Sequence, residues 1–264
     1  MDPPSGRAPR YFDSHCHLQD AAFDDDREAV LARALAAGVE EIVLSADDPE
    51  AAERGRALAA AAGSGPRIRW ASGLHPHHAA RWSPEVRRRI EEHLDAGAVA
   101  LGETGLDYHW MNSPREDQRR AFAEQLELAA ERGVPVVVHT REAEDETLEV
   151  LGASAVAPER VVLHCFTGSR AMLDQAVERG WYVSFSGIVT FRRFPAGELV
   201  PRVPSERLLA ETDAPYLAPA PHRGGRNEPA FVAATVARLA ELRGESVEAT
   251  AGLTRANAER FYGA

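Results

Sequence analysis

The chain has 264 residues and a mass of 28.7 kDa, which suffices for one large domain or two small ones with a self-supporting core. Its two cysteines cannot build a disulfide framework, and all 30 basic residues are arginine, which excludes Schiff-base chemistry, a P-loop lysine and a carboxylated lysine between two metals. The net charge of −11 argues against holding nucleic acid by bulk electrostatics, so a polyanion would need a local arginine patch or bound metal cations.

The N-terminal segment, residues 1–10, is proline-rich and polar, which predicts a tail without the apolar core of a signal peptide. No run approaches eighteen consecutive apolar residues, so no membrane span and no membrane partner are expected. We expect a cytoplasmic protein in which residues 11–264 form a single domain, and no feature indicates an obligate protein partner.

Beyond the tail, strand-like and helix-like segments alternate along the chain. Apolar or β-branched runs predict eight strands, at residues 11–17, 41–46, 68–75, 98–105, 134–139, 161–165, 181–187 and 208–213. Helical periodicity predicts helices at 24–37, 49–62, 84–94, 115–132 and 170–179, the second and third of them capped by Asp48 and Ser83. Segment 191–203 is expected to be a loop with at most a short helix, and two more helices are expected near 228–242 and 246–262.

Eight strand–helix units in a chain of this length predict an α/β fold of the TIM type, a (β/α)8 barrel. The alternative is a doubly wound open sheet, which usually has a glycine-rich turn after its first strand. The chain instead has Asp13, His15 and His17 there, which is a group of metal-type ligands and not a phosphate cradle.

Nine of the ten histidines lie at the C-terminal end of a predicted strand or in the loop that follows it. These nine are His15, His17, His75, His77, His78, His109, His139, His164 and His222. On a parallel barrel these strand ends converge on the active site. One such histidine would more often be structural, but nine on one face indicate a functional centre.

The pattern at residues 15–17 is the strongest single unit. Residues two apart on a strand face the same side, so His15 and His17 can bind one metal while Cys16 faces the surrounding helices. Asp13 is expected on the same face, one step lower, where it can orient a ligand histidine. Cys16 and Cys165 are both interpreted as packing residues that point outward.

Other predicted strands end in one metal-type side chain each: Glu103, His139, His164 and Asp213. Together with the two histidines of the first strand they are enough for two divalent metals, and this set suits Zn, Mn, Fe or Ni and leaves Mg possible. Two such metals activate a water and clamp both oxygens of a phosphoryl displacement. Because the chain has no lysine, an encoded carboxylate must bridge the metals, and Glu103, flanked by glycines, is the candidate.

Seven motifs, in this order along the chain, resemble the TatD family of metal-dependent deoxyribonucleases. They are residues 13–18 (DSHCHL), 73–77 (GLHPH), 102–108 (GETGLDY), 139–141 (HTR), 164–168 (HCFTG), 211–216 (ETDAPY) and 226–229 (RNEP). The resemblance implies a distorted TIM barrel with two divalent metals, Mg, Mn or Zn. It implies that one metal is held by His15, His17, Glu103 and Asp213, and the second by Glu103, His139 and His164.

The resemblance also implies roles in the reaction. Asp213 would accept a proton from the attacking water, so that Asp213 and Glu103 are the expected catalytic residues, and His75 would lie by the substrate phosphate. The loop after the last strand departs from the family pattern, because Gly225 stands where the family usually has lysine. Arg223 or Arg226 is expected to supply the positive charge and to bind substrate there.

The expected function is therefore cleavage of phosphodiester bonds in DNA, as an exonuclease that acts on single strands or strand ends through a metal-activated water. The alternative is a metal-dependent hydrolase of a small amide, ester or phosphoester, because a fold does not fix its substrate. A barrel that binds metal or nucleic acid without turnover is disfavoured by the complete ligand set.

Overall fold

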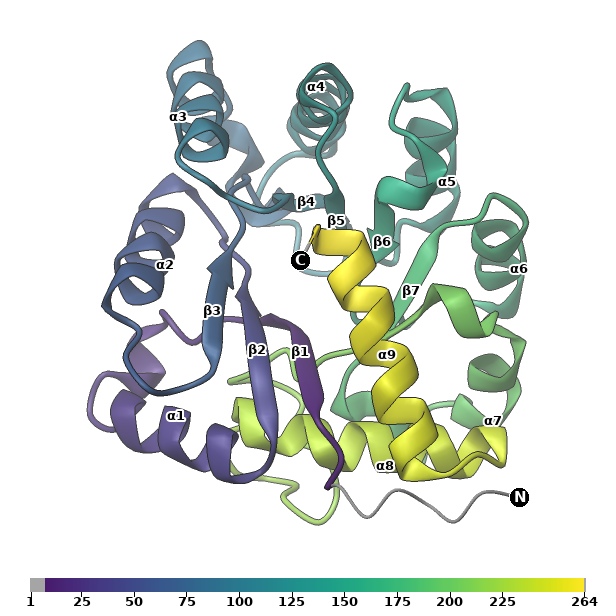
Figure 1. The fold of residues 1–264 in the computed structure, drawn as a ribbon. Helices are drawn as coiled ribbons and strands as arrows, with labels where there is room; N and C mark the ends of the chain where they lie inside the picture. The colour runs from purple at the N-terminus through teal and green to yellow at the C-terminus, as the bar shows by residue number, and fades with distance from the viewer. Residues whose placement is uncertain (1–7, 264) are drawn as a thin grey trace.

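Eight parallel strands form the centre of the computed structural model, which describes residues 8–263 (Figure 1). Most of the predicted tail, residues 1–10, lies outside these residues. The strands are β1 (Tyr11–Cys16), β2 (Val39–Leu44), β3 (Arg67–Trp70), β4 (Leu101–Asp107), β5 (Val136–Arg141), β6 (Val161–Leu163), β7 (Tyr182–Phe185) and β8 (Leu208–Ala210). All eight predicted strands are present, and several end earlier than predicted because the chain turns out of the sheet to build the functional face.

Helices connect the strands and cover the outside of the barrel. They are α1 (Arg27–Ala36), α2 (Pro49–Ala61), α3 (Pro84–Asp95), α4 (Arg115–Arg132), α5 (Glu144–Ala153), α6 (Arg170–Glu178), α7 (Ala196–Leu199), α8 (Val232–Arg243) and α9 (Val247–Tyr262). Asp48 caps α2 by accepting a hydrogen bond from the Ala51 N–H, and Ser83 caps α3 in the same way, as predicted. Helix α7 is the short helix expected in segment 191–203, whereas α5 is a helix that the periodicity did not single out. Within residues 8–263, no helix combines the length and the apolar character that a membrane crossing requires.

Two seams close the barrel. The strands form a β1–β2–β3 sheet and a β4–β5–β6–β7–β8 sheet, each parallel throughout. At the first seam, the Gly102 N–H donates to the Ser72 carbonyl at 3.0 Å, and a bridge pairs Ser72 with Leu101. At the second seam, the Asp213 N–H donates to the His15 carbonyl at 3.0 Å. The predicted barrel is confirmed and the open sheet is rejected. The two seams, which have few hydrogen bonds, are where the barrel is distorted.

One side chain from the region of each strand fills the inside of the barrel. This interior layer consists of Phe12, Val43, Ala71, Ala100, Val137, Val162, Tyr182 and Leu209, and Ala258, Phe261 and Tyr262 of α9 pack against it. Figure 1 shows α9, in yellow, crossing the strands. The Tyr262 hydroxyl donates to the Ser14 carbonyl at 2.8 Å, and its ring stacks on Phe12 with centroids 6.1 Å apart. Helix α9 therefore covers the end of the barrel that lies opposite to the histidines.

Strand alternation places part of the functional face directly above the interior layer. Val137 and Val162 point into the barrel, and residues two positions later point the same way. His139 and His164 are those residues. The intervening Val138 and Leu163 pack outward, against the helices.

Strand β1 departs from this alternation. Its pairing with β2 shifts register between Asp13 and Cys16, as a β-bulge does, so that Phe12 and His15 both face inward despite their odd spacing. Cys16 packs in the outer core between strands and helices, as predicted. The expectation for Asp13 is wrong, because its carboxylate accepts hydrogen bonds from the backbone N–H and the hydroxyl of Thr212, at 2.8 and 2.6 Å. Asp13 thus fixes the loop after β8 rather than a ligand imidazole.

Candidate metal centre

The six predicted metal ligands come together at the C-terminal mouth of the barrel. They lie on five strands or the loops directly after them: His15, His17, Glu103, His139, His164 and Asp213. All except His15 line a cavity of about 800 Å³. The convergence expected from strand ends on a parallel barrel is therefore present.

One carboxylate oxygen of Glu103 faces His15, on β1, and His17, directly after it. Glu103 Oε2 lies 3.4 Å from His15 Nε2 and 3.7 Å from His17 Nε2. Asp213 Oδ1 lies 3.6 and 3.5 Å from the same two nitrogens, which are 3.1 Å apart. Ligand distances of about 2.1 Å around one small cation place neighbouring ligand atoms roughly 3 to 3.5 Å apart, so these four atoms are spaced as one ligand group.

The other oxygen of Glu103 faces a second group of imidazoles. Glu103 Oε1 lies 2.7 Å from His164 Nε2, 3.0 Å from His139 Nδ1 and 3.4 Å from His75 Nε2. His75 was expected only beside a substrate phosphate, and it lies within reach of this second group. A single buried carboxylate thus separates two sets of histidines, one on each oxygen.

The donor set fits divalent metals. Nδ1 of His15 is buried and has no hydrogen-bond partner among the described residues, and the buried ring nitrogens of His164, although close to Glu103 and Glu211, are not aligned for a hydrogen bond with either carboxylate. Such orphaned buried groups are rare in folded proteins and point to an ion or a water. Imidazole and carboxylate are ligands that zinc, manganese and related cations accept, and the chemistry of the residues therefore matches the implied cofactor.

Mutual charge shifts the pKa values within this centre. Burial raises the pKa of the Glu103 carboxyl, but the imidazoles of His164 and His75 and their neighbours hold it well below its usual range. Burial disfavours the charged form of His17, but the hydrogen bond to Asp213 and nearby carboxylates raise its pKa to about 9. Burial lowers the pKa of His75 to about 4. Without metal, protons on some imidazoles offset the carboxylates, and bound cations would take their place.

Asp107, at the end of β4, is a positioning residue that the sequence analysis did not single out. Its Oδ2 lies 3.1 Å from Nε2 of His139 and 3.1 Å from Nε2 of His77. Its Oδ1 accepts hydrogen bonds from the backbone N–H groups of His109 and Trp110, at 3.0 and 2.9 Å. These imidazoles hold the pKa of the Asp107 carboxyl below its usual range although burial opposes this. The available signal was a carboxylate at the same strand end as Glu103.

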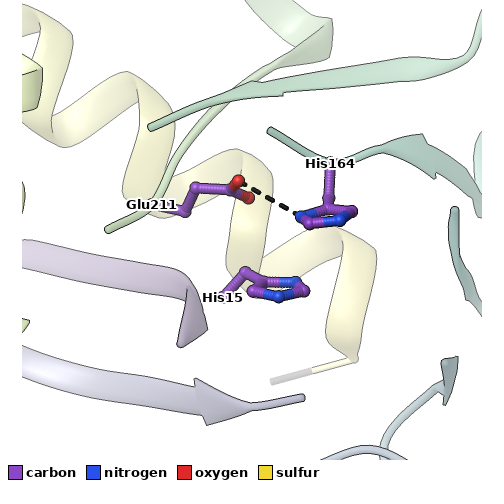
Figure 2. Close-up of side chains that lie close together, drawn as sticks. All are labelled: His15, His164 and Glu211. Atoms are coloured by element: carbon purple, nitrogen blue, oxygen red, sulfur yellow. Dashed lines mark ion pairs between the residues drawn. The ribbon is translucent and has the colours of Figure 1, made fainter. Parts of the chain in front are cut away.

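Glu211 lies behind His164 as Asp107 lies behind His139. Figure 2 shows the Glu211 carboxylate aimed at the His164 ring, with Oε1 3.4 Å from Nδ1, while the His164 ring stacks on His15 at 4.0 Å between centroids. The same oxygen accepts the Cys165 N–H at 2.7 Å. Glu211 follows the interior residue Leu209 by two, so strand alternation would have found it.

The structure does not bring the two predicted substrate-binding arginines to the cavity. Arg226 pairs with Asp26 through two hydrogen bonds of 2.8 Å, and its guanidinium lies over Phe23. Arg223 lies over the ring of Phe191. Neither belongs to the residues that line the cavity. Among the described residues, the guanidinium that does so is that of Arg141.

The expectation for Cys165 is wrong. Its side chain lines the cavity rather than packing outward, and its Sγ lies 3.2 Å from Ser186 Oγ. The physical reason is that β6 ends at Leu163, so Cys165, with φ of +41°, lies on a turn where strand alternation no longer applies. Burial raises the pKa of its thiol well above the usual range, so it is not a reactive thiolate.

A glycine allows β4 and β5 to approach closely beside the centre. Gly105 has φ of +139°, and a Cβ at this position would overlap the carbonyl oxygen of His139. The glycines around Glu103 thus serve the fit between the two strands that carry the bridging carboxylate and one of its imidazoles.

A closed parallel barrel with buried histidines and carboxylates at its C-terminal mouth defines a metal-dependent hydrolase of the TIM-barrel type. A model of the TatD related DNase family matches residues 12–263. The chain therefore belongs to this family, as the motifs predicted.

Relatives support this assignment over the whole length. The chain is 42% identical over 261 residues to the metal-dependent hydrolase TatD of Mycobacterium tuberculosis, covering 95% of this chain and 97% of that protein. It is 38% identical over 259 residues to the 3'-5' ssDNA/RNA exonuclease TatD of Enterobacter lignolyticus, covering 96% and 98%. The crystal structure of YjjV, a TatD homologue from Escherichia coli K12, superposes with a TM-score of 0.89 at 31% identity, covering 98% of this chain and 100% of that one.

Proposed function

We propose that the protein is an exonuclease that removes nucleotides from the ends of single-stranded DNA with two divalent metals. The observation that carries this proposal is the position of Glu103, whose two oxygens each face a separate group of imidazoles. A buried carboxylate in this position is suited to bridge two cations, and a pair of cations is suited to the cleavage of a phosphodiester bond.

The first metal would be held by His15, His17, Glu103 and Asp213, and the second by Glu103, His139 and His164, with His75 beside it. Bound there, such ions supply Lewis-acid stabilisation of the phosphate charge and make an attacking water more acidic. The proposed ions are Mg, Mn or Zn, because histidine and carboxylate ligands bind all three to different degrees.

Asp213 is the carboxylate suited to accept the proton of the attacking water. Its side chain is 13% exposed toward the cavity, against 3% for Glu103, so a water can reach it. Burial raises the pKa of Asp213, but the hydrogen bond from His17 and the charge of His15 bring it below its usual value, so the group is ionised at neutral pH. Its Oδ1, beside His15 and His17, can take up the proton while Glu103 lies between the two imidazole groups.

The substrate class follows from the relatives and from charge. Three of the similar curated proteins bear the name 3'-5' ssDNA/RNA exonuclease. A chain of net charge −11 repels a long duplex, whereas a strand end needs to place only a few phosphates at the cation-bearing mouth.

The test is metal-dependent release of mononucleotides from an end-labelled single-stranded oligonucleotide, run beside a panel of small esters, amides and lactones. Hydrolysis of the oligonucleotide that chelation abolishes is the expected result. Brisk hydrolysis of a small ester with no nucleotide release would instead favour a small-molecule hydrolase.

A further inference from the structure

Two exposed aromatic side chains line the cavity of the metal centre. Among the described residues, four large hydrophobic side chains are exposed, and two of them, Trp110 at 57% and Tyr216 at 55%, belong to the cavity lining. Trp110 follows β4 and Tyr216 follows β8, which lie across the barrel from each other in an eight-stranded closed order. Two exposed aromatic rings on the lining of one cavity are apolar surface of the kind that marks a ligand-binding groove.

Trp110 has a cation beside it. The guanidinium carbon of Arg141 lies 5.5 Å from the centroid of the Trp110 ring. Arg141 itself has no carboxylate within 4 Å in the described part of the chain, because the nearby Glu142 pairs with His109 and Glu144 accepts hydrogen bonds from Ser169. A flat apolar ring and an unpaired guanidinium thus lie side by side at the mouth.

The position of Trp110 is tied to the metal centre through Asp107. One oxygen of this carboxylate accepts the Trp110 N–H at 2.9 Å, and the other faces Nε2 of His139 at 3.1 Å. Arg141 follows His139 by two residues on β5, and the Tyr108 N–H donates to its carbonyl at 2.9 Å. The backbone that carries the ring and the guanidinium is therefore tied by hydrogen bonds to the strands that carry the candidate metal ligands.

We infer that Trp110 and Arg141 form a nucleotide subsite in which an unpaired base stacks on the indole and its phosphate contacts the guanidinium. This inference rests on the proposed function and explains how the exonuclease would select its substrate. Aromatic rings accept any base through its face, and arginine binds phosphate oxygens in pairs. A base within a duplex has both faces covered by its neighbours, so the subsite takes the bases of single strands and frayed ends rather than those inside a duplex.

Tryptophan fluorescence gives a direct measure of stacking. The other tryptophans, Trp70, Trp82 and Trp181, are at most 7% exposed, so Trp110 is the indole that a base can reach. The metal-loaded protein is titrated with a phosphorothioate-linked oligothymidylate and with an abasic strand of equal length and charge. The oligothymidylate is expected to quench the fluorescence, the abasic strand to leave it unchanged, and Trp110→Phe to remove the signal.

Kinetics supply the second readout. Trp110→Ala is expected to raise KM for a single-stranded oligonucleotide about 5- to 150-fold, the range for loss of one base stack, with little change in kcat. Trp110→Phe should recover most of this loss, and neither change should matter on an abasic strand. Met111→Ala is the matched control, since Met111 is the exposed neighbour and does not line the cavity.

The outcomes separate this inference from the proposed function. Hydrolysis of single-stranded DNA with no quenching and an unchanged KM in Trp110→Ala would overturn the subsite and leave the exonuclease standing. Quenching without any hydrolysis would support the subsite and overturn the exonuclease. Equal quenching by the abasic strand would also overturn base stacking, and absence of both signals would overturn both statements.

Discussion

Replacing Asp107 with asparagine tests whether the carboxylate behind His139 sets which ring nitrogen of this histidine can bind metal. His139 faces Glu103 through Nδ1 and Asp107 through Nε2. For Nδ1 to bind a cation, Nε2 must carry the proton and donate it to the carboxylate. In Asp107→Asn the amide oxygen can still accept the backbone N–H groups of His109 and Trp110, but its NH₂ group then faces Nε2. The imidazole will move its proton to Nδ1, which removes the lone pair that the metal needs.

The magnitude follows from this change of tautomer. Losing the acceptor behind a ligand histidine costs about 10- to 100-fold in metal affinity, or about 1.4 to 2.7 kcal/mol. The effect falls on one of the two metals, because His15 and His17 in the other group have no contact with Asp107. Unfolding stability should change little, because the substitution keeps the size of the side chain and the backbone acceptor.

The assay is calorimetric titration of the metal-free protein with Mn²⁺ or Zn²⁺, which resolves two sites when their affinities differ. Wild type should bind two ions tightly, and Asp107→Asn should bind one tightly and one weakly. Asp117→Asn is the matched control, because Asp117 lies on the surface of α4, where it pairs with Arg120 at 2.9 Å. Two unchanged affinities in a folded Asp107→Asn variant would refute the reasoning about the tautomer.

Four further results are expected. Glu103→Gln, whose amide has one oxygen to offer, should bind one metal ion rather than two by elemental analysis and lose turnover; two bound ions with normal activity would remove the bridging role. Metal binding at pH 7 should release at least one proton, because the pKa of His17 is about 9 in the metal-free protein, and metal affinity should rise with pH up to that value. Calorimetry in two buffers of different ionisation enthalpy measures the number of protons released, and zero release would contradict the expectation. Gly105→Ala should lower the free energy of unfolding in urea by roughly 2 to 4 kcal/mol, because backbone strain and the overlap with His139 add together. Gly97→Ala, with φ of +102° but open space around its Cβ, should cost less, and equal losses would show that the close approach of β4 and β5 is not the cause. Binding of a short single strand should show a slope of log affinity against log salt of about −1 to −3, and Arg141→Ala should make it shallower by about 0.7; an unchanged slope would show that Arg141 contacts no phosphate.

The convergence of the candidate ligands could be predicted because it depends on rules that are local in sequence. A histidine or carboxylate that ends an apolar strand must point near the barrel mouth if the strands are parallel, and His139, His164 and Glu103 obey this. The helix caps at Asp48 and Ser83 were predicted for the same reason, since the cap and its partner are three residues apart.

The errors came from features that only three-dimensional neighbours decide. The β-bulge in β1 turns Asp13 toward Thr212 in the loop after β8, which no spacing within residues 11–17 reveals. Cys165 lies past the end of a strand of three residues, where alternation does not apply. Asp26, far from Arg226 in sequence, holds that arginine away from the cavity.

The cover that α9 places on the barrel has a consequence for how a strand could be digested. Phe261 and Tyr262 pack on the interior layer, so the barrel has no passage from mouth to base among the described residues. A polymer cannot be threaded through it, so in the proposed reaction the strand and each released mononucleotide would share one opening. The remaining strand would have to shift at this mouth before its next phosphate could reach the candidate metal ligands.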